Sequence, residues 1–363
     1  MKGVILAGGL GKAFRPLSHT GPKQLVPIAN KPVLHYVIED LVEAEIREIG
    51  IVVGYTEERI NAIKDAMGDG SRWGCKITYI RQDAPRGLAH AVGICRQFIG
   101  QDNFVVYLGD NMIKGGIVPF VQEFNRANCE ASLLVAEVDE PRKYGIAVLD
   151  TNGEVVDVEE KPQNPRSNLA IIGIYLFTPA IFGMIDLIHP SARDELEITD
   201  ALGRMVKSGK YKVIVHKVTG WWDDTGTIEA VLNANSMILS NLHGENLGEV
   251  EGGAKVIGHV KIGKGTKILR GSVVKGPSII GENCLIGPDA YIGSHTSIGN
   301  RVTIEGGEIE GSIIYNDVKI NYKGRIVDSI IGEFSEIGSS QQSPRGNRFI
   351  VGSYSRISRQ DRA

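Results

Sequence analysis

The chain has 363 residues, a length that favours two or three domains, and 42% of the residues are hydrophobic, as is usual in globular proteins. Its 40 Lys and Arg against 43 Asp and Glu give a formal net charge of −3, which offers no support for binding nucleic acid or a membrane surface. Four cysteines without a C-x-x-C pair fit neither a zinc site nor a disulfide framework, and no apolar run reaches 18 residues, so we expect a cytoplasmic protein.

The first 242 residues alternate between strand-like and helix-like stretches. Apolar runs predict strands at residues 4–7, 49–53, 77–80, 104–108 and 132–138, and helices lie between them at 33–44, 57–67, 88–97 and 118–128. Because these runs are apolar at nearly every position, we expect a mostly parallel α/β sheet that is buried on both faces. Strands at 145–149, 155–159, 170–177 and 213–218 follow more closely and favour added antiparallel pairing, and a helix is expected at 229–242.

A glycine-rich loop, Gly8-Gly9-Leu10-Gly11, directly follows the first strand. In an open α/β sheet, ligands bind beyond the carboxyl ends of the strands, where backbone N–H groups can hold phosphate. The loop is not a Walker A motif, because Gly11-Lys12 is followed by Ala13, and it lacks the third glycine of a dinucleotide fingerprint. A plain tight turn is the alternative interpretation of the loop taken alone.

A proline-framed segment, P-K-Q-L-V-P-I-A-N-K-P, begins at Pro22 and ends at Pro32. Its three prolines forbid a continuous helix and impose an extended path. Lys23 on such a path is a fixed cation, unlike a lysine on a solvated surface.

Aliphatic residues recur every six positions in the last third of the chain, where Tyr291 is the only aromatic residue between positions 245 and 314. The nine positions are Val256, Ile262, Ile268, Val274, Ile280, Ile286, Ile292, Ile298 and Ile304. Glycine often comes next, and a small or compact residue stands four positions later. This period predicts a parallel β-helix of hexapeptides with one inward aliphatic per unit. We expect the phase to continue through Ile314, Ile320 and Ile326 and to slip by one at Ile331 and Ile337.

Taken together and in this order, the motifs resemble those of the sugar-1-phosphate nucleotidyltransferases. The nearest resemblance is to glucose-1-phosphate thymidylyltransferases in the long form with a C-terminal left-handed β-helix. The matching blocks are L-A-G-G-x-G with Pro16, the P-K-Q-L block, Gln82 with P-R-G-L-A, L-G-D-N at 108–111, K-Y-G at 143–145, E-E-K-P at 159–162, G-I-Y at 173–175, L-E-I-T-D at 196–200 and W-D-D-T-G-T at 222–227. The resemblance implies a Rossmann-like catalytic domain over residues 1–242 and a hexapeptide-repeat left-handed β-helix over residues 243–363.

The resemblance also implies a reaction and its site. Glucose 1-phosphate would attack the α-phosphate of dTTP (or UTP) directly, with Mg²⁺ as cofactor, and pyrophosphate would leave. Lys23, Asp110, Asp224 and Arg15 are implied as catalytic residues, and the two aspartates also as metal ligands, with Asp223 a solvated bystander. The implied nucleotide-binding residues are Leu6, Ala7, Gly8, Gly9, Gly11, Gln24, Gln82, Pro85, Gly87 and Leu88. The implied sugar-phosphate-binding residues are Tyr144, Gly145, Glu160, Lys161, Ile171, Tyr175 and Trp222.

One departure from the family pattern concerns the leaving group. The family usually has G-T-R-L-R-P, whereas this chain has Gly11-Lys12-Ala13-Phe14-Arg15-Pro16, so alanine replaces the arginine expected to clamp pyrophosphate. This difference bears on the rate more than on the substrate, and it leaves open a non-catalytic regulatory homologue that binds sugar nucleotides. A second alternative is a bifunctional UTP-using enzyme whose β-helix also transfers acyl groups, with His259 or His295 as base. We expect no nucleic-acid or membrane partner, and a homo-oligomer formed through the β-helix.

Overall fold

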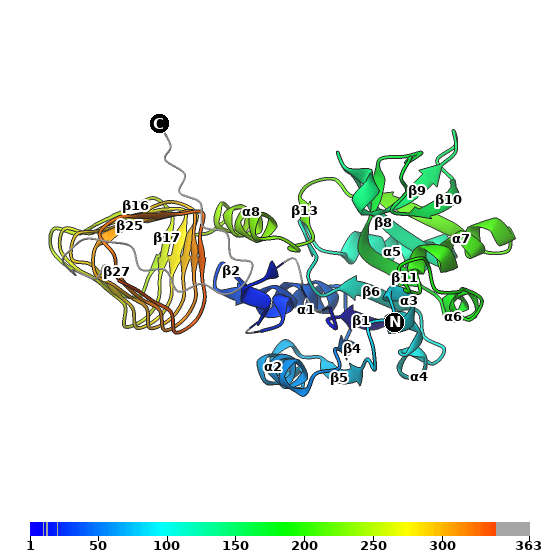
Figure 1. Cartoon of the computed structure of the whole chain (residues 1–363), viewed down its shortest axis with the longest axis horizontal. Helices are drawn as coiled ribbons and strands as arrows, with labels where there is room; N and C mark the ends of the chain where they lie inside the picture. Colours follow the sequence, from blue (N-terminus) through cyan, green and yellow to red (C-terminus); the bar gives the residue numbers. More distant parts are fainter. Residues whose placement is uncertain (10, 12–13, 20, 339–363) are drawn as a thin grey trace.

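A computed structural model describes residues 1–338 except residues 10, 12, 13 and 20. Figure 1 shows an α/β domain and, beside it, a β-helix, with helix α8 (Ile228–Leu239) between the two. The predicted fold class is therefore confirmed. Within the described residues, no helix combines the length and the apolar character needed to cross a membrane.

The α/β domain is built on a nine-stranded sheet of order β10-β9-β11-β6-β1-β4-β5, in which β8 pairs with β11 and β12 pairs with β8. Strands β6, β1, β4 and β5 run parallel, whereas β11 is antiparallel to β6, β8 and β9. Strands β9, β10 and β11 thus pair antiparallel as expected, whereas the expectation is wrong for β12, which pairs parallel with β8. The strand bounds are β1 Lys2–Leu6, β4 Glu48–Val53, β5 Lys76–Arg81, β6 Phe104–Leu108, β8 Ala131–Glu137, β9 Gly145–Leu149, β10 Val155–Glu160, β11 Leu169–Phe177 and β12 Val213–Lys217.

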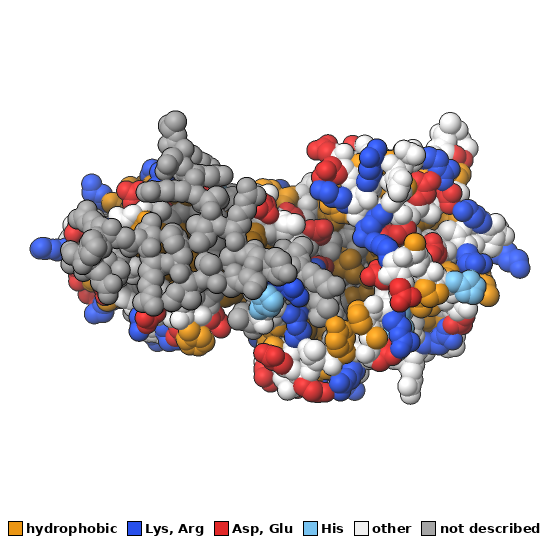
Figure 2. Space-filling model, viewed as in Figure 1, with side chains coloured by type: hydrophobic (Ala, Val, Ile, Leu, Met, Phe, Trp, Pro, Cys, Tyr) orange, Lys and Arg blue, Asp and Glu red, His pale blue; other side chains and the backbone are white. Residues whose placement is uncertain are grey.

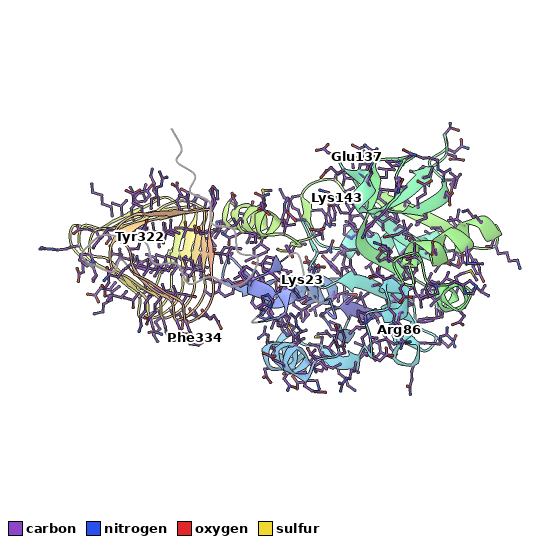
Figure 3. All side chains as sticks on the ribbon, in the orientation of Figure 1. Lys23, Arg86, Glu137, Lys143, Tyr322 and Phe334 are labelled. Atoms are coloured by element: carbon purple, nitrogen blue, oxygen red, sulfur yellow. The ribbon has the colours of Figure 1, made fainter. Side chains whose placement is uncertain are left out.

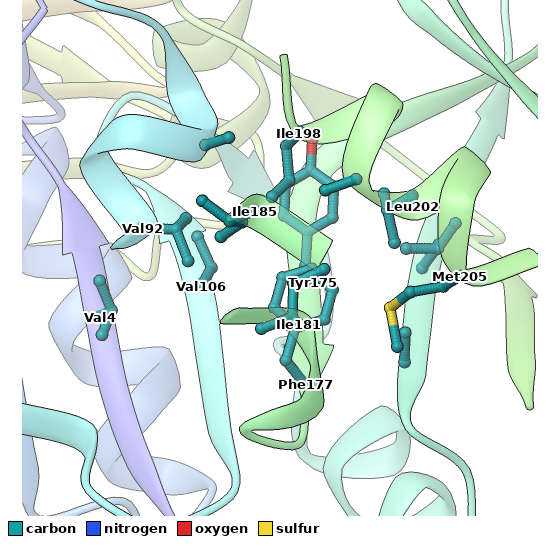
Figure 4. Packing of buried hydrophobic residues seen from close by; sticks show 14 of the residues in the cluster. Val4, Val92, Val106, Tyr175, Phe177, Ile181, Ile185, Ile198, Leu202 and Met205 are labelled. Carbon is teal, nitrogen blue, oxygen red and sulfur yellow. The ribbon is translucent and has the colours of Figure 1, made fainter. Parts of the chain in front are cut away.

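Two hydrophobic cores cover the two faces of this sheet. Along β1, Val4 and Leu6 belong to one core and Ile5 and Ala7 to the other, which explains why the strand is apolar at every position. The first core, part of which is drawn in Figure 4, is closed by α3 (Leu88–Gly93), α4 (Arg96–Ile99), α6 (Ala180–Ile185) and α7 (Ile198–Ser208). The second core is closed by α1 (Val33–Glu43), α2 (Glu57–Met67) and α5 (Val118–Ala127).

The helices of this domain differ from the expectation in two ways. The helix expected at 88–97 is split into α3 and α4 around Ile94 and Cys95, next to Gly93, a residue of low helix propensity. Helices α6 and α7 were not predicted, although Ile198, Leu202 and Met205 in α7 have the spacing of one buried helical face.

Three parallel sheets form the faces of the β-helix, and neighbouring strands in each sheet come from successive coils. The first sheet is β14 Glu245–Asn246, β17 Val260–Ile262, β20 Ser278–Ile280, β23 Thr296–Ile298, β26 Ile313–Ile314 and β29 Ile330–Ile331. The second is β15 Glu249–Val250, β18 Lys267–Ile268, β21 Leu285–Ile286, β24 Thr303–Ile304, β27 Lys319–Asn321 and β30 Glu336–Gly338. The third is β16 Lys255–Ile257, β19 Val273–Lys275, β22 Ala290–Ile292, β25 Gly307–Glu310 and β28 Arg325–Val327.

The predicted inward aliphatic positions from Ile262 to Ile304 are all buried, whereas Val256 in the first coil is 38% exposed. The later positions Ile314, Ile320, Ile326, Ile331 and Ile337 also belong to this core, as expected. The uninterrupted period of six is wrong after Ile304, because the next inward residues are Ile309 and Ile314, each five positions on. Gly306 and Gly307 have φ values of +81° and +82°, and a backbone that turns through this region can close a coil with fewer residues.

A fourth hydrophobic cluster joins the two units. It combines Phe14, Ile28 and Val33 of the α/β domain, Val231 of α8 and Ile313 of the β-helix. Asn235 of α8 is buried at this junction: its Nδ2 donates to the His295 carbonyl at 3.1 Å, and its Oδ1 accepts from Ser297 Oγ at 2.6 Å and from the Ala29 N–H at 2.9 Å. The β-helix is therefore packed against the α/β domain by both apolar and polar contacts.

Candidate active site

The glycine loop lies over Lys23 and Gln24. A methyl group added at Gly9 would lie 3.8 Å from Lys23 Cε, and one added at Gly11 would lie 3.4 Å from Lys23 Cβ. Gly11 also has φ +63°, which favours glycine. The glycine loop and the proline-framed segment thus lie side by side, while Lys12 and Ala13 lie outside the described residues.

Gln82, which follows β5, packs against the start of the same loop. A methyl group at Gly8 would lie only 2.6 Å from Gln82 Oε1, so the amide occupies the space that a side chain would need. Gly87 (φ +97°) precedes α3, which begins at Leu88, and a methyl group there would lie 2.6 Å from the Leu196 backbone. Pro85 is exposed nearby. Gly8, Gln82 and their neighbours thus stand beyond the carboxyl ends of β1 and β5.

Backbone hydrogen bonds fix the ends of three strands around this loop. The Gly109 N–H donates to the Leu6 carbonyl at 3.0 Å, and the Ala7 N–H donates to the Val52 carbonyl at 2.8 Å. Gln24 is buried beside Gly109, and its Oε1 has no hydrogen-bond partner among the described residues. A buried polar atom without a partner costs free energy, so this amide is suited to meeting a ligand.

Lys23 and Asp110 form an ion pair in which both side chains are mostly buried. Figure 3 shows Lys23 between the two units of the molecule. Lysine and arginine side chains are interspersed with acidic ones over the face of the α/β domain in Figure 2. Because that face has no single sign of charge, binding of a polyanion must rely on local groups such as Lys23.

Two loops are tied together at Asp110. Strands β7 (Met112–Ile113) and β13 (Trp222–Asp223) pair antiparallel. Asn111 is buried between them: its Nδ2 donates to Asp110 Oδ1 at 3.2 Å, and its Oδ1 accepts from Trp222 Nε1 at 2.8 Å. These contacts orient one oxygen of Asp110 while Lys23 holds the other.

Asp223 is the last residue of β13, and Asp224 follows it. Each carboxylate accepts a hydrogen bond from a backbone N–H two residues later. Asp223 Oδ1 accepts from the Thr225 N–H, and Asp224 Oδ1 accepts from the Gly226 N–H, both at 3.1 Å. Burial raises the pKa of Asp223 to about 6. The expectation that Asp223 is solvated is therefore wrong, since it is partly buried in the same turn as Asp224.

Asp110 and Asp224 offer carboxylate oxygens, the kind of ligand that magnesium uses. Within the described residues, no group of three or more His, Cys, Asp or Glu side chains could hold a metal by itself. Mg²⁺ commonly uses one or two carboxylates and completes its shell with phosphate oxygens and water. Asp110 and Asp224 thus suit a magnesium ion that arrives with a phosphate ligand, and they do not form a closed structural metal site.

Glu160 is the centre of a second cluster of polar residues. Its Oε1 accepts from Arg193 Nη2 at 2.7 Å, its Oε2 accepts from Thr199 Oγ1 at 3.0 Å, and Lys161 Nζ lies 4.0 Å from Oε1. A methyl group at Gly145 would lie 3.4 Å from Glu160 Oε2. Gly145, Glu160 and Lys161, three of the expected sugar-phosphate-binding residues, are thus neighbours.

Arg193 and Glu197 are part of this cluster but were missed from the sequence. Arg193 also donates to Glu197 Oε1 at 2.8 Å, and that buried oxygen accepts from Ser191 Oγ at 2.7 Å. These residues come from the loop before α7, which carries no motif around Arg193. Only the acidic residue of the L-E-I-T-D block, Glu197, is a sequence signal for this loop.

Some of the other expected site residues lie near these clusters and others do not. Tyr144 and Trp222 meet edge to face with ring centroids 5.8 Å apart, and burial together with the charge of Asp224 raises the pKa of Tyr144. Ile171 is buried near Gly145. Tyr175 is not on a site surface: its ring stacks on Phe177 within the first core. Arg15 is exposed and forms no hydrogen bond or ion pair with another described residue.

A cavity of about 1270 Å³ adjoins this site and lies between the two units. Pro22, Lys23 and Leu25 line it from the proline-framed segment, and Tyr315 and Phe334 line it from the β-helix. Lys23 is therefore a neighbour of both the glycine loop and the junction. A smaller cavity of about 760 Å³ lies between α6 and α7, and Thr199, which donates to Glu160, is one of its lining residues.

Comparison with known proteins identifies the family of the chain. A model of the nucleotidyl transferase family matches residues 2–241. The chain belongs to this family. Residues 274–359 are similar to the GMPPB C-terminal domain. The chain is a nucleotidyltransferase, and its glycine loop, Lys23 and Asp110 all lie in the matched segment.

Relatives of similar length match this nucleotidyltransferase almost from end to end. The low-salt glycan biosynthesis nucleotidyltransferase Agl11 of Haloferax volcanii is 48% identical over 358 residues, covering 98% of this chain and 99% of that protein. A glucose-1-phosphate thymidylyltransferase of Streptomyces griseus is 42% identical over 356 residues, covering 98% and 99%. A solved Bacillus anthracis protein, described as a glucose-1-phosphate thymidylyltransferase and crystallised with sucrose, is 36% identical with a TM-score of 0.62 and covers 68% of this chain and 98% of its own.

Proposed function

We propose that this nucleotidyltransferase transfers the thymidylyl group of dTTP to glucose 1-phosphate, giving dTDP-glucose and pyrophosphate. The observation that carries the proposal is the Lys23–Asp110 ion pair beneath the glycine loop, where a fixed cation and a carboxylate stand beyond adjacent strand ends. The Streptomyces griseus relative named above supports thymidylyl transfer in particular.

In the proposed reaction, a phosphate oxygen of glucose 1-phosphate forms a bond to the α-phosphorus of dTTP. The bond between the α-phosphorus and the bridging oxygen to the β-phosphate breaks, and pyrophosphate leaves. Lys23 neutralises charge on the α-phosphate, and the backbone of Gly8, Gly9 and Gly11 holds the phosphates. Gln24 and Gln82, with Gly87 and Leu88, line the nucleotide side. Alignment and charge neutralisation supply most of the catalysis in such a reaction.

Asp110 and Asp224 would hold Mg²⁺ in the proposed site. A bound Mg²⁺ offsets the negative charge of the two phosphate substrates and orients their oxygens. Lys23 would then exchange Asp110 for the α-phosphate as its main partner. Thr225 and Asn111 keep Asp110 in place during that exchange, because one holds its carbonyl and the other its Oδ1.

On the sugar side, Glu160 would accept hydrogen bonds from sugar hydroxyls, and Lys161 would contact the sugar phosphate. Tyr144 and Trp222 would pack along the sugar, with Gly145 leaving space for it. Arg193 lies within hydrogen-bond distance of Glu160, so a second cation is available beside the phosphate. We propose residues 1–242 as the catalytic domain, residues 243–363 as an oligomerisation module, and the cytoplasm as the compartment.

Acyl transfer by the β-helix is not favoured by its histidines. The His295 side chain lies 3.3 Å from Ser240 Oγ at the end of α8, and its carbonyl accepts from Asn235, so the residue is part of the junction. His259 is exposed. His295 is thus held in the junction, and no described side chain is hydrogen-bonded to His259.

A panel of nucleoside triphosphates with glucose 1-phosphate tests the proposal. Pyrophosphate release should be fastest with dTTP, should require Mg²⁺, and should stop when EDTA is added. Faster turnover with UTP would overturn thymidylyl transfer while keeping the nucleotidyltransferase. Tight binding of dTDP-glucose without turnover of any triphosphate would instead identify a non-catalytic homologue.

A further inference from the structure

Arg59, the third residue of α2, carries a charge that has no partner of opposite sign within the described residues. The side chain is partly buried: its Nη2 donates to the Ser18 carbonyl, whereas its Nη1 is buried without a hydrogen-bond partner in the described chain. Glu57, two positions earlier in the same helix, pairs with Arg81 at 2.6 Å. The first turn of a helix also disfavours a cation, because the helix dipole is positive at that end. An unpaired, partly buried cation is costly, which indicates that a negative ligand would be stabilised nearby.

A chain of two hydrogen bonds connects Arg59 to the glycine loop. Ser18 is 2% exposed; its carbonyl accepts from Arg59, and its Oγ donates to the Gly11 carbonyl at 2.7 Å. The Gly11 carbonyl also accepts from the Phe14 N–H at 3.0 Å. A methyl group added at Gly11 would lie 3.3 Å from Ser18 Cβ, so these two residues are closely packed. Ser18 therefore links the position of the loop to that of α2.

We propose that Arg59 is a positioning residue for the phosphate groups of the nucleotide. The inference rests on the proposed function, in which the backbone of the glycine loop holds those phosphates. A carbonyl oxygen that turned toward a phosphate would repel it. Both lone pairs of the Gly11 carbonyl are instead occupied by Ser18 and Phe14, so this oxygen is held toward them and not toward an anion.

The backbone of the glycine loop has donors available for an anion. Within the described residues, the N–H groups of Gly8, Gly9 and Gly11 donate no hydrogen bond. Successive N–H groups in such a turn bind phosphate oxygens when they point to one side. Their direction depends on where the carbonyls of the loop are held, and Arg59 fixes one of these carbonyls through Ser18.

Lys23 and Arg59 are two cations near Gly11 that differ in their partners. Lys23 packs against Gly11 directly and is paired with Asp110, so it must exchange that carboxylate for a phosphate. Arg59 acts on Gly11 through Ser18 and has no carboxylate to exchange within the described chain. We therefore expect Arg59 to affect mainly the binding of the phosphates, and Lys23 mainly the chemical step.

Calorimetric titration of the full-length protein with inorganic pyrophosphate and Mg²⁺ tests this role. Arg59→Met, which removes the charge and the donor, should weaken pyrophosphate binding by about 10- to 100-fold, the range for one hydrogen bond to a charged group. Arg59→Lys keeps a charge and a donor, and it should recover at least half of the lost binding free energy. Lys64→Met is the matched control, because Lys64 is exposed on the same helix, and it should change binding by less than about twofold. Unchanged binding in Arg59→Met would overturn the proposal.

Steady-state kinetics separates positioning from a general loss of structure. Arg59→Met should raise the KM for the triphosphate by about tenfold or more and change the KM for glucose 1-phosphate by less than about twofold. Ser18→Ala should also raise the KM for the triphosphate. The double variant should be no weaker than Arg59→Met, because both residues act in one chain. Additive losses, or an equal rise in both KM values, would contradict positioning through Ser18.

The result for Arg59 can be distinguished from the result for the proposed function, because pyrophosphate binding requires no turnover. Weakened pyrophosphate binding in Arg59→Met, in a protein that turns over no triphosphate, would refute the proposed reaction and support the role of Arg59. Normal turnover of dTTP with unchanged pyrophosphate binding in that variant would do the reverse. Should Arg59→Met fail to fold, Ser18→Ala gives the same comparison with Lys64→Met, and equal pyrophosphate binding in these two variants would refute the role of Arg59.

Discussion

Thr225 donates a hydrogen bond of 2.6 Å from Oγ1 to the backbone carbonyl of Asp110. Thr225 is buried, and this bond joins the loop that carries Asp224 to the loop that carries Asp110. Because the bond uses the backbone of Asp110, the carboxylate stays available for Lys23 and for ligands. The separation of the two acidic side chains therefore depends on a residue that need not contact substrate.

We expect Thr225→Val, which keeps the shape but removes the donor, to lower kcat by about 10- to 100-fold. A buried carbonyl left without its partner costs about 1–3 kcal/mol, and the loop can then shift Asp224 away from Asp110. Thr227→Val is the control, since Thr227 Oγ1 caps α8 by accepting from the Ala230 N–H at 3.1 Å. Its loss should cost about 1 kcal/mol of stability with little change in kcat. Equal kcat in the two variants would contradict a positioning role.

The Lys23–Asp110 ion pair allows stability and activity to be separated. Lys23→Met or Asp110→Asn alone should lower the free energy of unfolding by about 1–3 kcal/mol, because each leaves one mostly buried charge unpaired. The double variant should recover at least half of that loss, yet all three variants should lose pyrophosphate release. Urea unfolding and turnover, measured on the same preparations, check both statements. Recovery of activity in the double variant would show that the charges are not used in the reaction.

A pH-dependent stability effect is expected at Asp40 in α1. Burial raises its pKa to about 7, while Tyr107 donates a hydrogen bond of 2.8 Å to Oδ2, and Glu39, Glu43 and Lys31 are the nearby charges. The unfolded chain has an ordinary carboxyl pKa near 4, so the folded state binds the extra proton between about pH 4 and pH 7. The contribution of the Asp40 carboxyl group to the free energy of unfolding is therefore fully present below pH 4 and is lost as the pH rises through 7.

Asp40→Asn should therefore be more stable than the unaltered protein at pH 8, by on the order of 2 kcal/mol, and the difference should shrink toward pH 4. Urea titrations at pH 5 and pH 8 measure it. Asp65→Asn, at an exposed position in α2, is the matched control. A larger gain for Asp40→Asn at pH 5 than at pH 8 would contradict the sign.

The junction can be weakened without touching the proposed site. Asn235→Leu removes three hydrogen bonds from a residue that is 1% exposed, and it should destabilise the protein by about 2–4 kcal/mol. Asn233→Leu, on the exposed side of the same helix, should cost less than 0.5 kcal/mol, roughly the range of surface changes. Calorimetry of Asn235→Leu should resolve two transitions if the units lose their coupling. A single, unshifted transition would mean that the apolar cluster alone holds the junction.

Ala13 gives a prediction about rate. If an arginine normally holds the leaving pyrophosphate at this position, Ala13→Arg should raise kcat several-fold with little change in which sugar is accepted, since one preorganised donor can be worth about 10²–10³ in rate. Arg15→Ala is the comparison, because Arg15 is exposed and two positions away. A null effect of Ala13→Arg combined with loss of activity in Arg15→Ala would show that Arg15 already holds pyrophosphate. Retained activity in Ala13→Arg, Arg15→Ala and Lys12→Ala would mean that metal and backbone suffice.

The parts of the fold that were predicted are those with a local signal. The hexapeptide period is a repeated local pattern, and the buried positions from Ile262 to Ile304 follow from it directly. The slip at Ile309 was missed because five-residue spacing depends on the turn geometry at Gly306 and Gly307, which a period of six does not contain. The two-sided burial of β1 was similarly visible in its unbroken apolar run.

In the candidate site, too, the residues within recognisable motifs were predicted, and those brought in by long-range packing were not. Lys23 and Asp110 each belong to a recognisable block. Lys23 lies 17 residues after the end of β1, however, so the pairing of β1 with β6 does not by itself predict their contact. Arg193 stands in a loop without a motif, and only long-range packing brings it to Glu160. Tyr175 looked like a site residue because its block matched, but its strand faces the first core at that position.

The junction limits how this protein can be recombined with its relatives. Consider a chimera in which residues 1–242 of this chain are joined to the β-helix of a relative. The new β-helix would then pack against Phe14, Ile28 and Val33 of this chain, three residues near its start that form part of the junction. The same stretch includes Lys23, so repairing the interface by substitution would alter the frame around the proposed catalytic lysine. A transplant of this β-helix should therefore include residues 14–33 and α8, which makes the exchangeable unit discontinuous in sequence.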